Sequence, residues 1–238
     1  MIKEAIQYVV GLAAPNVQDI NGEKYSDKNL SRVDKELRAS KIEMSTLGSL
    51  VEYIKSETDK FKGKLLVHIV SPSRVELISQ LDGDRKRETL VSVVANLPDI
   101  RLDTFVDQEE FIIMMQSQFV SNTGRNDVMA FAGNVVDETI QKYGDDGVSQ
   151  KATISTGIAS KEDFIIPNPV ELLPYRTFQE IQQIPTRFVF RMRNGNRCAQ
   201  MALFEADGGA WKIDAVQAVA EYLRENLKEQ SDILTVIA

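Results

Sequence analysis

Four acidic side chains near one predicted turn are the residues whose types and spacing could hold a metal ion. Asp137 and Glu138 precede the turn, and Asp145 and Asp146 lie within it. Hard cations take several oxygen ligands. Asp145-Asp146 lacks the spaced ligands of a calcium loop, however, and Gly-Asp-Asp-Gly is ordinary turn chemistry. We favour a structural turn, with a divalent-metal site as the alternative.

Three arginines form the second candidate set. Arg187, Arg191 and Arg193 share parity within a predicted strand, so their side chains project from one face. A guanidinium group can bind two oxygens of one phosphate or carboxylate at the same time. We favour a solvated face or ion pairs with nearby carboxylates, and an anion-binding face is the alternative.

The remaining motifs give little support for catalysis. A single histidine, His68, and a single cysteine, Cys198, exclude paired-histidine metal motifs, multi-cysteine zinc sites and an intrachain disulfide. Asp207-Gly208-Gly209 could hold an anion at the start of a helix, but the fuller phosphate-loop patterns are missing, and we interpret it as a cap. We therefore predict a non-enzymatic protein without a cofactor.

The elements that must position these residues centre on residues 126–159. Apolar residues recur at steps of three and four from Val128 to Tyr143, which predicts a helix over 127–143 that is capped by Asn126 or Asp127. The apolar residues then alternate from Val148 to Ile158, which predicts a strand with one wet face.

Similar patterns predict the other elements. Val, Ile and Leu at 65–70, 75–81 and 88–95 indicate an antiparallel meander. Asn194-Gly195 predicts a tight turn between strands at 188–193 and 198–204. Helices are expected after a Ser45 or Thr46 cap, after an Asp107 and Glu110 capping box, and over 210–226, with a last strand at 233–237. The fold class is α+β, with antiparallel sheets and packed amphipathic helices.

The predicted domain organisation has two parts. Residues 1–44 contain a short helix and an extended arm, and residues 45–238 form one α+β domain. Four of the seven prolines fall between residues 164 and 185 and favour an extended edge, which we interpret as a partner-binding lip.

The composition of the chain limits which classes of partner we expect. The 28 basic residues against 35 acidic ones leave a net charge of −7, which argues against nucleic acid as a partner unless a local basic patch exists. The apolar runs are shorter than the roughly 20 residues that cross a bilayer, and the first residues lack a secretory pattern. We expect a cytoplasmic protein without a membrane partner.

Four segments carry a family resemblance. They are the stretches Gly133-Asn134-Val135-Val136-Asp137-Glu138, Tyr143-Gly144-Asp145-Asp146-Gly147-Val148-Ser149-Gln150, Phe188-Val189-Phe190-Arg191-Met192 and Leu203-Phe204-Glu205-Ala206-Asp207-Gly208-Gly209-Ala210-Trp211. With them, the chain from about Ser45 onward resembles a family of uncharacterised phage and prophage proteins, the YfdQ-like domain of unknown function. The resemblance implies a bacteriophage gene expressed in the cytoplasm of a host bacterium, and brings no catalytic residues.

Three functions follow as expectations. The first is a non-enzymatic phage accessory protein that acts through protein contacts, as a homo-oligomer and with a host protein as a further partner, in host takeover or counter-defence. The second is a structural subunit of a self-assembling phage-encoded particle or shell. The third is a metal-dependent enzyme acting on nucleotides or nucleic acid.

Overall fold

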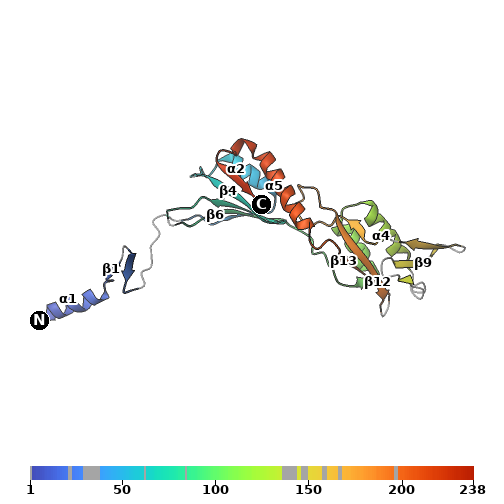
Figure 1. Ribbon diagram of the computed structural model, residues 1–238, viewed down its shortest axis with the longest axis horizontal. Coiled ribbons are helices and arrows are strands. Elements are labelled where there is room, and N and C mark those ends of the chain that lie inside the picture. Colours follow the sequence, from blue (N-terminus) through green and yellow to red (C-terminus); the bar gives the residue numbers. More distant parts are fainter. Residues whose placement is uncertain are drawn as a thin grey trace. The chain divides into compact units, whose positions relative to one another are not determined.

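The protein divides into an N-terminal unit, Met1–Ala39, and a larger unit, Ser40–Ala238. The computed structural model describes residues 2–20, 23–28, 38–61, 63–83, 85–135, 144–145, 150–156, 160–165, 168–195 and 198–238. Helices packed on mainly antiparallel sheets make the fold α+β, as the sequence predicts (Figure 1).

The N-terminal unit contains one helix and one hairpin. Helix α1 (Ile2–Ala13) is followed by the antiparallel strands β1 (Val17–Ile20) and β2 (Glu23–Ser26). Ile2, Ile6, Val9 and Val10 fall on one side of α1, because these spacings return to the same face of a helix. The predicted short N-terminal helix is therefore confirmed.

A five-stranded sheet forms the first part of the larger unit. Its order is β14-β4-β5-β6-β3. Its strands are β3 (Ile42–Met44), β4 (Leu65–Ser71), β5 (Arg74–Ser79), β6 (Thr89–Val94) and β14 (Leu234–Ile237). The predicted meander is confirmed, since β4, β5 and β6 pair antiparallel. The two outer strands differ, because β14 pairs with β4 and β3 pairs with β6 in parallel.

Helices α2 (Leu47–Ser56) and α5 (Trp211–Asn226) lie on one face of this sheet (Figure 1). Alternate strand residues such as Val67 and Leu77 meet Leu50 and Leu223 from the helices in one fully buried core. Thr46 caps α2 as predicted, since its side chain accepts a hydrogen bond from Ser49 N–H. A short 3-10 turn, Lys228–Gln230, connects α5 to β14.

A second sheet, of order β11-β12-β13-β7, carries the candidate arginines. Its strands are β7 (Val106–Asp107), β11 (Val170–Leu172), β12 (Thr186–Asn194) and β13 (Ala199–Glu205). Helices α3 (Gln108–Gln118) and α4 (Thr123–Asn134) pack on one face. There the ring of Phe190 meets Phe111 and Phe131 edge-on, with centroids 5.7 and 5.6 Å away.

Helix α4 differs from its prediction at both ends. It begins at Thr123, because Asn122 rather than Asn126 or Asp127 is the cap, accepting a hydrogen bond from Arg125 N–H at 2.8 Å. It ends at Asn134, and Val135 is extended. The predicted continuation over 136–143 lies outside the described residues.

Two local predictions are also wrong in detail. Asp107 stands at the start of α3 without a side-chain cap bond, because its carboxylate accepts from Gln200 Nε2 instead, at 3.1 Å. In the β12–β13 hairpin, Asn194 pairs with Ala199, and Gly195 N–H donates to the Cys198 carbonyl. The hairpin is confirmed, but Asn194 belongs to β12 and not to the turn; residues 196–197 lie outside the described residues.

A three-stranded sheet completes the described elements. Its order is β10-β9-β8, and its strands are β8 (Gly144–Asp145), β9 (Gln150–Thr156) and β10 (Ser160–Ile165). Strand β9 lies within the strand predicted over 148–158 and pairs antiparallel with β10.

Candidate functional site

The structure does not describe the predicted metal site. Asp137, Glu138 and Asp146 lie outside the described residues, and Asp145 is described only as backbone in β8. Elsewhere in the described chain, no three or more His, Cys, Asp or Glu side chains gather as ligands for a metal ion.

The structure brings the three predicted arginines together on one face of β12. Arg187, Arg191 and Arg193 alternate with Phe188, Phe190 and Met192, which are buried in the core. Arg187 and Arg193 are exposed, and Arg191 is partly exposed. The arginine row therefore occupies the face of the four-stranded sheet opposite α3 and α4. We call this the arginine face.

Aromatic residues that the sequence does not single out join this face. The Arg193 guanidinium lies over the Phe105 ring, 4.1 Å from its centroid, and Phe105 meets Phe204 edge-on with centroids 6.0 Å apart. Arg193 Nε also donates to Gln200 Oε1 at 3.0 Å. The parity of the hairpin places Phe204 on this face, because it pairs with Val189. The Phe105 contact depends on the tertiary fold.

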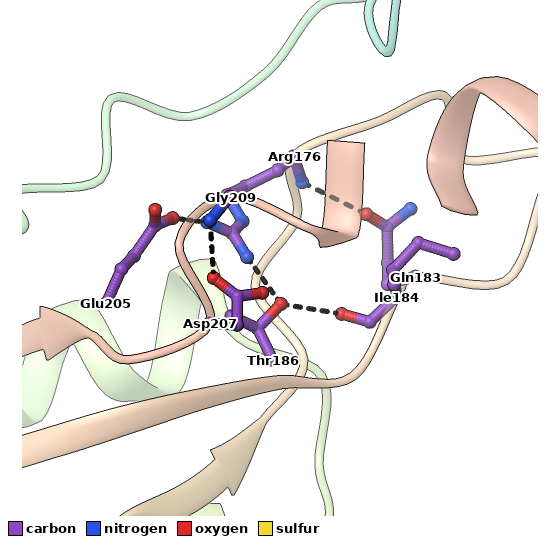
Figure 2. A network of polar contacts seen from close by, with 7 residues as sticks. All are labelled: Arg176, Gln183, Ile184, Thr186, Glu205, Asp207 and Gly209. Atoms are coloured by element: carbon purple, nitrogen blue, oxygen red, sulfur yellow. Dashed lines mark hydrogen bonds and ion pairs between the residues drawn. The ribbon is translucent and has the colours of Figure 1, made fainter. Parts of the chain in front are cut away.

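Arg176 is the most densely connected charged side chain in the described structure, and it was not predicted. Its Nη1 pairs with Glu205 Oε1 and its Nη2 donates to Thr186 Oγ1 at 2.6 Å (Figure 2). The guanidinium also stacks on Trp211, 3.9 Å from the ring centroid. Arg176 thus joins the loop before β12, the end of β13 and the first residue of α5.

Burial lowers the pKa of Arg176, and the charge of Glu205 and its hydrogen bond partly oppose this, as does the charge of Asp207. The backbone on either side is held as well. Arg176 N–H donates to Gln183 Oε1 at 3.0 Å, and the Thr177 hydroxyl donates to the Pro72 carbonyl at 2.6 Å. These contacts are with the chain itself, so we interpret the cluster as a structural clamp.

The predicted cap before the last helix has a clear outcome. Asp207 Oδ1 accepts a hydrogen bond from Gly209 N–H at 3.0 Å (Figure 2). Gly208 and Gly209 both have positive φ angles, which suit residues without Cβ. This bond closes a turn before the helix, and the interpretation as a cap is wrong, because the N-cap of α5 is Ala210 and it makes no side-chain cap bond.

The proline-rich segment borders a hollow of about 340 Å³. Leu173, Tyr175 and Ile181 contribute apolar surface to it, and Gln179 and Gln182 contribute amides. Its use as a partner-binding lip stays a prediction.

The apolar side of α1 is the most exposed hydrophobic surface in the described chain. Its four aliphatic residues have large exposed fractions: Ile2 79%, Ile6 58%, Val9 64% and Val10 65%. In the hairpin that follows, Val17, Ile20 and Tyr25 are each at least half exposed. Among the N-terminal side chains that the structure describes, only Lys28 is even partly buried.

No family model, curated protein or solved structure matches this chain. The resemblance to the phage and prophage family therefore stays a prediction. No helix in the described part of the chain combines the length and the apolar character needed to cross a membrane.

Proposed function

We propose that this protein acts through protein contacts and that its copies associate through the N-terminal unit. The observation that carries the proposal is the exposed apolar side of α1, Ile2, Ile6, Val9 and Val10. The partner we infer is a second copy of the same chain.

The helix and the hairpin of the N-terminal unit are each only marginally stable on their own. An isolated helix of 12 residues is marginal in water, because nucleation is costly and each further residue adds little. A lone two-stranded hairpin is also marginal. The described N-terminal side chains bury almost nothing, so these elements need an external surface to become stable.

The apolar side of α1 can supply that stabilisation. Burying an Ile or Val side chain contributes roughly 1.5–3 kcal/mol, and α1 presents four of them in one stripe. Contiguous exposed apolar surface of this kind is typical of a protein interface. Lys3 and Glu4 are the charged residues of α1 and carry opposite signs, which gives the helix no preference for an anionic surface.

The geometry of the contact decides the size of the assembly. If α1 docks on α1 of a second copy, the contact is symmetric and closes as a dimer. If α1 docks on a different surface of the next copy, the contact repeats head to tail and builds rings or larger particles. The second case corresponds to the other candidate function, a subunit of a self-assembling particle or shell.

The family resemblance supplies the biological setting of the proposal. We place the oligomer in the cytoplasm of an infected bacterium, as an accessory protein of a phage that binds a host protein. This part rests on the resembling segments, such as Tyr143 to Gln150, and not on α1.

The test is the mass of the full chain in solution, measured by light scattering after size exclusion. One chain weighs 26.7 kDa, and we expect the wild type to elute at a multiple of this mass. Val9→Glu places a charge in the apolar stripe and should shift the protein to the mass of one chain, because burying an unpaired carboxylate is costly.

Gln7→Glu is the matched control, since it adds the same charge on the polar side of α1 and should leave the mass unchanged. A wild type that elutes at 26.7 kDa at every concentration contradicts the proposal. Dimers would exclude a shell, and a large closed particle would favour one.

A further inference from the structure

The arginine face is the side of the β11-β12-β13-β7 sheet that points away from the core shared with α3 and α4. β12 alternates between core residues and the arginines, and Ala202 of β13 lies opposite Arg191. Ala202 is 1% exposed, so other parts of the chain cover the sheet at this point, while Arg191 stays partly exposed. The helices α3 and α4 pack on the other side of the sheet, so no described helix covers the arginines.

Two of the three arginines make no pair with any residue that the structure describes. Within the described structure, neither Arg187 nor Arg191 has a hydrogen-bonding or ionic partner for its guanidinium, and Arg191 Nη1 is buried. Glu171 is the cross-strand neighbour of Arg187 in β11, yet the two side chains form no ion pair. A partly buried cation without an acceptor is costly. An anionic ligand would offset that cost.

The third arginine is arranged differently. Arg193 lies flat on Phe105 and is fixed by Gln200, which in turn donates to Asp107. These contacts hold the guanidinium flat on Phe105, and the Phe105 ring in turn meets the Phe204 ring edge-on. Aromatic rings and guanidinium planes are the surfaces on which unpaired nucleic-acid bases stack.

We infer that the arginine face binds single-stranded nucleic acid. Phosphate oxygens pair with Arg187 and Arg191, and a base stacks on the Phe204 ring. An antiparallel sheet with cations and aromatic side chains on one face is suited to an unpaired strand, because the bases of that strand are free to stack.

The aromatic residues distinguish this ligand from an acidic peptide. A carboxylate-rich segment can pair with the guanidinium groups, but it has no flat base to stack on the aromatic ring of Phe204. The charge balance limits the affinity, since the three arginines share this surface with Glu171 and Asp107, and the whole chain carries −7. The expected binding is therefore weak and strongly dependent on salt.

The test is fluorescence anisotropy of the full chain with a labelled oligothymidylate of about 16 nucleotides, at about 50 and 200 mM salt. We expect binding at low salt that weakens at high salt. Arg191→Ala and Phe204→Leu should each reduce the affinity about tenfold, through a lost phosphate contact and a lost stacking surface.

Arg101→Ala is the matched control, because it removes one positive charge from a residue that pairs with Glu110 away from this face. It should leave the affinity nearly unchanged. Arg187→Ala, at an exposed position, replaces Arg191→Ala if that variant does not fold.

Two results overturn the inference. One is the absence of binding at the lower salt concentration. The other is that a labelled oligoglutamate of equal charge binds as tightly as the oligothymidylate, with Phe204→Leu affecting neither, which would assign the face to an acidic protein segment. The measurement does not depend on the N-terminal unit, so the proposed self-association can fail without affecting it.

Discussion

Arg176 and Arg191 show two different uses of a partly buried arginine. The Arg176 side chain is 12% exposed. Its guanidinium donates to Glu205 and Thr186 and stacks on the Trp211 ring. Arg191 has no acceptor among the described residues. The first arrangement stabilises the fold, and the second leaves binding capacity for a ligand.

Arg176→Ala should lower the free energy of unfolding by about 2 kcal/mol. The change removes an ion pair and a stacked cation and leaves Glu205 without its partner. The expected cost is below that of a fully buried pair because Glu205 keeps 28% of its side-chain exposure, which lets water reach the carboxylate.

Chemical denaturation measures this change, and Arg187→Ala is the control at an exposed position, with an expected effect below about 0.5 kcal/mol. Equal effects of the two substitutions would show that the Arg176 cluster does not stabilise the fold.

Helix α4 packs closely against strand β11 at Gly124. A Cβ on Gly124 would lie 2.3 Å from the Glu171 carbonyl oxygen and 3.0 Å from Val170 Cγ2. Asn122 Nδ2 donates to the same carbonyl at 3.0 Å. The start of α4 is therefore fixed to β11, which is the neighbour of the arginine-bearing strand.

Gly124→Ala should destabilise the protein by about 1–3 kcal/mol, because backbone atoms must move to make room for the added methyl group. Gly133→Ala is the control in the same helix, where an added Cβ meets nothing within 4 Å.

The control should be neutral or stabilise by up to about 1 kcal/mol, as alanine favours helix more than glycine does. Thermal and chemical denaturation of both variants measures the difference. A Gly124→Ala protein as stable as the wild type would mean that α4 and β11 are not in close contact.

Local patterns predicted the elements better than their boundaries and partners. The meander β4–β5–β6 and the parity of the three arginines follow from alternation alone. The start of α4 was missed because its first turn, after Asn122, is polar and lies before the apolar stripe. The contact of Arg176 with Glu205, 29 residues away, and the parallel pairing of β14 with β4 depend on long-range packing.

At the scale of the whole molecule, the two units differ in how they are stabilised. The larger unit contains two buried cores, one under each of its main sheets. The described N-terminal side chains form no such core and leave Ile2, Ile6, Val9 and Val10 exposed. This contrast is the reason for assigning the N-terminal unit to contacts between copies.

Hydrogen exchange of the full chain across a range of protein concentrations tests this assignment most directly. The amides of α1 should be unprotected when the protein is dilute and should become protected as copies associate, because docking stabilises the helix. The amides of α2, a helix of similar length on a buried core, serve as the internal control and should be protected throughout. If α1 exchanges freely at every concentration while α2 stays protected, α1 does not dock on a second copy and the account is contradicted.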